Sequence, residues 1–90
     1  MTEHRQVAKV TISPTAEEEF EGLPRPIKRR VVRLFERLER WPAVSGAKPL
    51  SGNLAGCYRL RTGDYRVRFR IEGDRVIVEQ IGHRDRFYED

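Results

Sequence analysis

Apolar and polar residues follow the period of two that a strand requires in three stretches of this 90-residue chain, residues 7–12, 58–61 and 65–71. A further apolar stretch, residues 76–81, reads as the last strand. The last three of these four stretches are separated by the dipeptides Gly63-Asp64 and Gly73-Asp74. Such dipeptides are typical of two-residue hairpin turns. The pattern therefore predicts one early strand and a later meander of three antiparallel strands.

The two turns also predict which residues face each other across the meander. The first turn pairs Arg61 with Arg66, Arg59 with Arg68, Leu60 with Val67 and Tyr58 with Phe69, and the second pairs Ile71 with Val76, Phe69 with Val78, Arg68 with Glu79 and Arg70 with Ile77. One face of the meander is then apolar, and the other carries a row of arginines.

Two helices are predicted between the early strand and the meander. The first begins at Ser13 as an N-cap, or at Thr15 with Glu18 completing a capping box, and it ends near Gly22. The second covers residues 26–41, where apolar side chains recur at spacings of four, three, four and three. Residues 43–56, rich in Pro, Gly, Ser and Asn, are expected to form a loop.

These elements predict an α+β fold: a strand, a helical hairpin and a three-stranded antiparallel meander, with the helices packed on one sheet face. Residues 1–90 are expected to form a single domain, because this length supports one core. The face of the sheet that carries the arginines is expected to stay open.

The distribution of charged residues indicates the kind of partner that this chain binds. Five arginines fall between positions 59 and 70, and the chain has 18 basic and 14 acidic residues, a net charge of +4. Like charges that face each other across strands lower stability, so this clustering indicates a polyanion or an acidic protein as partner. The alternative is an ordinary solvated basic surface.

Cysteine content and hydropathy exclude several other classes. One cysteine cannot form an internal disulfide, and we find no zinc-ligand spacing. No apolar run is long enough to span a membrane, and the first residues are polar. We therefore expect a cytoplasmic protein with no membrane contact.

Four short segments carry a resemblance to a known family. They are residues 48–52 (KPLSG), residues 57–61 (CYRLR), residues 63–67 (GDYRV) and residues 81–88 (IGHRDRFY). In this order and spacing the chain resembles the RelE branch of the RelE/ParE superfamily of type II toxin–antitoxin toxins, over nearly its whole length. The resemblance implies a RelE-like fold and an endoribonuclease that cleaves messenger RNA in the ribosomal A site and inhibits translation.

The resemblance also implies the chemistry and the partners. The ribose 2′-hydroxyl attacks the adjacent phosphate and leaves a 2′,3′-cyclic phosphate, with no metal and no cofactor. The partners are a cognate acidic antitoxin, the ribosome and messenger RNA, with operator DNA bound only through the antitoxin.

Family catalytic positions, carried over one at a time, fall on Arg59, Arg61, Arg66, Arg84 and Tyr88. Well-described RelE toxins have lysines where this chain has Arg59 and Arg61, and they have more residues before the tyrosine. Arginine is a poor general base because its pKa exceeds about 12. These arginines are therefore expected to hold the phosphate and its transition-state charge.

The remaining candidates have weaker support from the residues themselves. His83 titrates near neutral pH and is a candidate acid or base, or it shapes the turn that directs Arg84. Lys48, Arg59, Arg68 and Arg86 are candidate RNA contacts, although the predicted pairing of Arg68 with Glu79 favours a structural ion pair. Cys57 is expected to pack at the start of its strand.

Two other functions remain open. A ParE-type toxin would poison DNA gyrase without cutting RNA, and an inactive relative would only bind its antitoxin. ParE toxins generally lack the arginine and tyrosine set around Arg61, Arg84 and Tyr88, so the sequence favours RNA cleavage.

Overall fold

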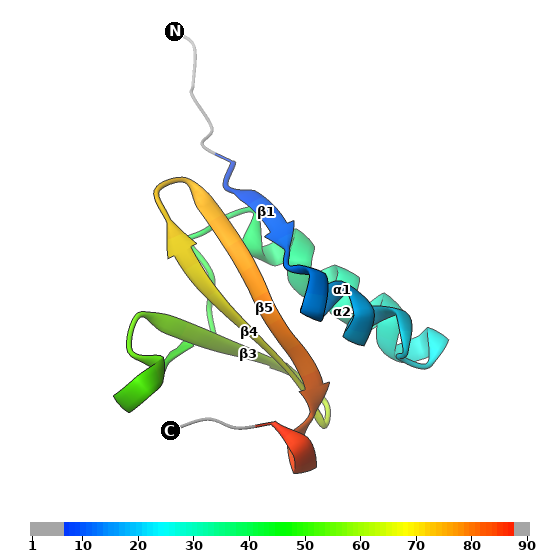
Figure 1. Cartoon of the computed structure of the whole chain (residues 1–90). Coiled ribbons are helices and arrows are strands. Elements are labelled where there is room, and N and C mark those ends of the chain that lie inside the picture. Colours follow the sequence, from blue (N-terminus) through cyan, green and yellow to red (C-terminus); the bar gives the residue numbers. More distant parts are fainter. Residues whose placement is uncertain (1–6, 88–90) are drawn as a thin grey trace, which may run out of the picture.

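The computed structural model describes residues 7–87 as a five-stranded sheet with two helices against one face (Figure 1). The strands are β1 (Lys9–Ile12), β2 (Lys48–Pro49), β3 (Cys57–Thr62), β4 (Tyr65–Glu72) and β5 (Arg75–His83). Their order in the sheet is β1-β5-β4-β3-β2. The predicted α+β class, the helical hairpin and the antiparallel β3–β4–β5 meander are confirmed.

Helix α1 (Pro14–Glu21) begins where the serine cap predicts. The Oγ atom of Ser13 accepts a hydrogen bond from the Ala16 N–H at 3.1 Å. Thr15 lies inside the helix, so the serine cap is the correct one of the two alternatives. Gly22 follows directly as the C-cap, as expected.

Helix α2 (Arg25–Leu38) supplies most of the cover for the sheet. Its apolar stripe faces inward, with Val31, Leu34 and Leu38 buried against the strands. The helix starts one residue before the predicted position and ends at Leu38, short of the predicted residue 41. Trp41 lies in the turn that follows and still packs on the core.

The core lies between the helices and the apolar sheet face. Its largest fully buried side chain is Phe69 of β4, which contacts the rings of Trp41 and Tyr58. Leu60, Val67, Val76 and Val78 are also buried there, as the alternation predicts.

The early strand is shorter than predicted and joins the sheet in parallel. It covers Lys9–Ile12 and pairs with β5, so that Val10 lies opposite Val76. The backbone before it is tied to the second helix through a 2.8 Å hydrogen bond from the Ala8 N–H to the Glu39 carbonyl.

Part of the segment expected to be a loop is a strand. Lys48 and Pro49 form β2, which pairs antiparallel with β3 at the sheet edge. Two residues with a proline carry almost no periodic signal, so the sequence pattern missed this strand.

The β4–β5 register differs from the predicted one at a single position. Phe69 lies opposite Val78 as expected, but Arg68 lies opposite Gln80, which leaves Glu79 as an extra residue in a β-bulge. The predicted ladder pairing of Arg68 with Glu79 is therefore wrong. In hindsight the inward residues Val76, Val78 and Ile81 signal the bulge, because their spacing changes from two to three.

Among residues 7–87, neither helix has the length and apolar character needed to cross a membrane.

Candidate nucleic-acid interface

The arginines of the meander occupy the sheet face away from the helices. The β3–β4 register is the predicted one, with Arg61 opposite Arg66 and Arg59 opposite Arg68. Gly63 adopts a φ of 59° at the turn, while Asp64 has no positive φ, which is the pattern of a II′ hairpin turn. We call the turn end the part of this face nearest Gly63.

Arg61 and Arg66 lie at the turn end. They are direct neighbours across the two strands, where side chains stand about 5 Å apart. Arg61 is exposed, and it contacts no acidic side chain among the residues that the structure describes. Arg66 is half-buried and lies opposite Gly82, against which the Phe87 ring packs.

Arg84 is brought to this end of the sheet by Asp64. The Arg84 N–H donates a 2.7 Å hydrogen bond to the Asp64 carbonyl, and its Nε lies 3.8 Å from Asp64 Oδ1. A second carboxylate, that of Asp85, lies 3.8 Å from the same Nε. The guanidinium side chain is still 58% exposed, so it remains accessible to a ligand.

The sequence indicated no role for Asp64 beyond the turn. Because Asp64 and Arg84 are twenty positions apart in sequence, no local pattern relates them, and only the folded chain shows the contact. The side chain of Arg30 on α2 also lies close to this turn, because its Nη1 would be 3.2 Å from a Cβ placed on Gly63. Basic side chains from the hairpin and from the segment after β5 thus lie at the turn end, and Arg30 of α2 approaches the turn itself.

Arg59 does not lie on an open surface, contrary to expectation. It is only 8% exposed and sits between Lys48 of β2 and Arg68 of β4 in the ladder. Strand β2, which the sequence pattern missed, is the reason that Arg59 is internal to the sheet. Lys48 itself is exposed and extends the same face at the edge.

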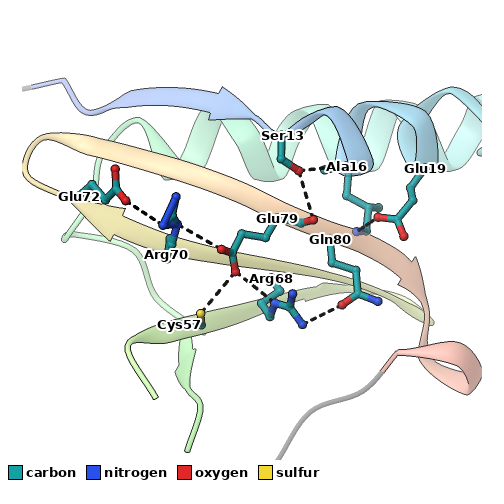
Figure 2. A network of polar contacts seen from close by, with 10 residues as sticks. Ser13, Ala16, Glu19, Cys57, Arg68, Arg70, Glu72, Glu79 and Gln80 are labelled. Carbon is teal, nitrogen blue, oxygen red and sulfur yellow. Dashed lines mark hydrogen bonds and ion pairs between the residues drawn. The ribbon is translucent and has the colours of Figure 1, made fainter. Parts of the chain in front are cut away.

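Arg68 and Arg70 are paired with acidic groups (Figure 2). Arg68 Nε lies 3.3 Å from Glu79 Oε1, and Arg70 Nε lies 3.1 Å from Glu79 Oε2. Arg70 also contacts Glu72 at 2.7 Å. The expected ion pair between Arg68 and Glu79 is confirmed as a contact, even though the ladder register behind it was wrong.

His83 points away from the arginine row. It pairs with Tyr65 across the strands and its ring meets the Tyr65 ring edge-on at 5.2 Å. Since Arg66 pairs with the preceding Gly82, His83 leaves the strand on the opposite face from Arg66. Its Nδ1 accepts a 3.2 Å hydrogen bond from the Asp85 N–H, and the same nitrogen lies 3.4 Å from Asp85 Oδ2.

Arg86 accompanies His83 rather than the arginine row. Both line a hollow of about 320 Å³ beside the link between the two helices, together with Tyr65, Leu23 and Pro24. The structure therefore brings Arg61, Arg66 and Arg84 together at the turn end and separates His83 and Arg86 from them.

The described chain ends on a buried aromatic ring. Phe87 is 8% exposed, and its Cδ1 would lie 3.6 Å from a Cβ placed on Gly82. Tyr88, the remaining candidate, lies outside the described residues.

Cys57 packs at the start of β3, as the sequence predicts, with its thiol directed at Glu79. The Sγ–H donates to Glu79 Oε1 at 3.4 Å. Burial raises the pKa of the Cys57 thiol, and the hydrogen bond and negative charge of Glu79 raise it further, against a lowering by Arg68 and Arg70.

Cys57 should therefore react several-fold more slowly with iodoacetamide at pH 8 than a free cysteine does, because the thiolate is the reactive form. Because folding raises the pKa of this thiol, its contribution to the free energy of unfolding is fully present below the pKa that it has in the unfolded chain. That contribution is lost as the pH rises towards the pKa that it has in the folded chain. Mass spectrometry of alkylation against time measures the rate. Alkylation as fast as that of free cysteine would contradict the assignment.

The chemistry available at the turn end is anion binding. Guanidinium groups match phosphate oxygens with paired donors and keep their charge at any physiological pH. Within residues 7–87, no three His, Cys, Asp or Glu side chains converge as metal ligands do. The site can hold a phosphate and stabilise added negative charge on it.

A family model matches residues 10–88 of this chain, and its description is the ParE toxin of the type II toxin–antitoxin system parDE. Among curated proteins, toxin RelG of Mycobacterium tuberculosis is 35% identical over 82 residues, which cover 88% of this chain and 93% of RelG. Toxin RelE3 of Methanocaldococcus jannaschii is 25% identical over 84 residues, covering 90% of this chain and 96% of RelE3.

A solved structure is similar over the same length. The toxin–antitoxin complex RelBE2 of Mycobacterium tuberculosis contains a chain that matches with a TM-score of 0.77 and 31% identity, covering 86% of this chain and 98% of that one. Sequence and fold agree over almost the full length of each relative. This chain therefore belongs to the RelE/ParE superfamily of type II toxin–antitoxin toxins.

Proposed function

We propose that this toxin is an endoribonuclease that cleaves messenger RNA in the ribosomal A site and so stops translation. The observation that carries the proposal is the turn end, where Asp64 ties Arg84 to the hairpin that bears Arg61 and Arg66. Three arginines from two separate segments thus lie at one end of the sheet, and the side chains of Arg61 and Arg84 are exposed. The name of the curated relative RelE3 supports the same reading, and the second curated relative, RelG, is also named as a toxin.

In this mechanism the arginines bind the scissile phosphate. The ribose 2′-hydroxyl attacks phosphorus, the bond to the 5′-oxygen breaks, and a 2′,3′-cyclic phosphate and a 5′-hydroxyl remain. Arg61 and Arg84, both exposed, stabilise the charge that builds up on the phosphate oxygens in the transition state. No metal takes part in this scheme.

The arginines of the turn end are poorly suited to proton transfer. Arginines do not act as bases, and His83 lies on the other face of the sheet from Arg66. We therefore assign proton transfer to Tyr88 and the alignment of the 2′-hydroxyl to the ribosome, because correct positioning by itself contributes several kcal/mol, about 7 or more in favourable cases.

A translation assay with toeprinting tests the proposal. Purified toxin added to a ribosome programmed with messenger RNA should produce a cut within the A-site codon, and the product should end in a cyclic phosphate. A toxin that arrests growth but leaves the messenger intact on such ribosomes would refute the proposed reaction.

His83→Gln should keep the cleavage rate within a few-fold of wild type, whereas Tyr88→Phe should lower it strongly. The reason is the orientation of His83, which faces Tyr65 and Asp85 rather than the arginines. Single-turnover cleavage on stalled ribosomes measures both rates. A severe loss in His83→Gln with Tyr88→Phe unchanged would reverse the assignment and make the histidine the proton-transfer group.

We further propose an acidic antitoxin as the partner of this chain, through which operator DNA is bound. The chain carries a net charge of +4, and the similar RelBE2 structure is a complex of a toxin with its antitoxin. Co-expression with the short neighbouring reading frame should give a complex that survives purification. A non-toxic lone monomer in high yield would contradict this.

The description of the family model supports a second candidate, poisoning of DNA gyrase, because it names ParE. The two functions separate in one comparison. Toxicity that a resistant gyrase relieves, together with intact messenger RNA, favours gyrase. Cleavage on the ribosome, unaffected by the gyrase allele, favours the nuclease.

A further inference from the structure

The bulge in β5 places a carboxylate in the middle of the arginine row. Because Phe69 lies opposite Val78 and Arg68 opposite Gln80, Glu79 is an extra residue between them. Both Glu79 and Gln80 then contact Arg68, so the two successive side chains point to the same face (Figure 2). A regular strand would have placed them on opposite faces.

Helix α1 holds this bulge in place. The Ser13 hydroxyl, which caps the helix, donates a 3.3 Å hydrogen bond to the Glu79 carbonyl. Two residues on, the Ile81 N–H donates to the Glu19 carboxylate at 2.8 Å. These contacts satisfy backbone groups at the bulge, so its position is fixed by the fold.

Three side chains surround the two carboxylate oxygens of Glu79. Arg68 and the Cys57 thiol face Oε1, and Arg70 faces Oε2. The Arg70 Nε–H forms no hydrogen bond within residues 7–87, so its 3.1 Å contact with Glu79 is a Coulombic one. Arg68 is held a second time, because its Nη1 donates to Gln80 Oε1 at 2.8 Å.

The arginine row is therefore divided into two unequal parts. Arg68 is paired with Glu79, Arg70 is shared between Glu79 and Glu72, and the Arg68 and Glu79 side chains are only 20% and 26% exposed. Arg61 at the other end is exposed and contacts no acidic group in the described part of the chain. The division matters because Arg66, Arg68 and Arg70 recur along β4 every 6.6 Å or so, as alternate strand residues do.

A row of equal charges would let an RNA backbone bind in several registers. Only the register at the turn end places a phosphate beside Arg84. We propose that Glu79 is the specificity-determining residue that withholds Arg68 and Arg70 from RNA and so confines phosphate binding to the turn end. The proposal rests on the proposed nuclease function, whose substrate it positions.

The test is the salt dependence of binding to a short 2′-O-methyl oligoribonucleotide, which lacks the attacking hydroxyl and is not cleaved. Log K falls as log salt concentration rises, and each phosphate neutralised on a single strand makes this slope steeper by about 0.7. The slopes are magnitudes, so a higher slope means a steeper fall. Glu79→Gln should raise the slope by about 0.7 to 1.4, the lower value if Glu72 continues to hold Arg70. Affinity at 0.1 M salt should rise on the order of tenfold.

Glu17→Gln is the matched control, since Glu17 is exposed in the first turn of α1 and loses the same charge. Its slope should equal that of wild type. Equal slopes for Glu79→Gln and Glu17→Gln would overturn the proposal. Thermal melting of both proteins establishes that they are folded at the temperature of the assay.

Arg68→Gln supplies a second test that leaves Glu79 in place. A withheld arginine contributes no phosphate contact, so the slope should stay at the wild-type value, whereas Arg61→Gln should lower it by about 0.7. A fall in Arg68→Gln as large as that in Arg61→Gln would overturn the role of Glu79. A rise in Glu79→Gln with no fall in Arg61→Gln would instead refute the proposed phosphate site and leave the withholding by Glu79 standing.

Discussion

Arg61→Ala and Arg84→Ala should each lower messenger cleavage by about two to three decades and abolish growth arrest. In the proposed reaction each variant loses a charged contact to the phosphate in the transition state, and such a contact is worth about 2 to 4 kcal/mol. Both side chains are exposed and outside the core, so the fold should be unaffected. Single-turnover cleavage on programmed ribosomes measures the loss.

Arg75→Ala is the matched control for these two variants. Arg75 is an exposed arginine of the same sheet, but it lies at the start of β5 beside the Gly73 turn, away from the turn end. It should cleave within a few-fold of wild type. Wild-type toxicity in a folded double variant, Arg61→Ala with Arg84→Ala, would show that the reaction does not take place at the turn end.

Phe69→Ala should lower the free energy of unfolding by about 3 to 5 kcal/mol, the usual cost of deleting a buried phenylalanine. Phe69 is fully buried, and its ring lies 5.4 Å from that of Trp41 and 5.7 Å from that of Tyr58. A loss of this size is a large fraction of the stability of a small domain, about 5 to 15 kcal/mol. Urea unfolding followed by Trp41 fluorescence measures it.

Val32→Ala is the control for this change, because Val32 on α2 is 40% exposed and outside the core. Its cost should be about 0.5 kcal/mol or less. The two kinds of inactive variant are then separable, since Phe69→Ala loses toxicity through unfolding and Arg61→Ala keeps a wild-type melting curve. A Phe69→Ala protein as stable as Val32→Ala would show that the aromatic cluster contributes little.

Local pattern predicted the meander and the helices well. The register of β3 against β4 follows from a two-residue turn and an alternation of period two, and every predicted pair in that hairpin is present. The inward stripe of α2 and the Ser13 cap follow in the same way from spacing and from one side chain. Such features are visible in sequence because their partners lie within a few residues or across one short turn.

The candidate site was predictable in its residue types and much less so in its arrangement. The sequence indicated a row of arginines with Arg84 in addition, and it indicated an ion pair between Arg68 and Glu79. It did not indicate that Arg59 is buried or that His83 lies on the other face from Arg66. Alternation assigns a side chain to a face, but only neighbouring strands determine how deeply it is buried.

The sequence by itself determined the family, the α+β fold and the basic character of the sheet face. The tertiary structure alone decided which arginines are available, because three features that decide it are long-range. Strand β2 encloses Arg59, Asp64 draws Arg84 to the hairpin turn, and α1 holds the bulge that directs Glu79 at Arg68. Each joins different segments of the chain through backbone hydrogen bonds or charge. Of the three, only the bulge leaves a trace in the apolar pattern, the wider spacing between Val78 and Ile81.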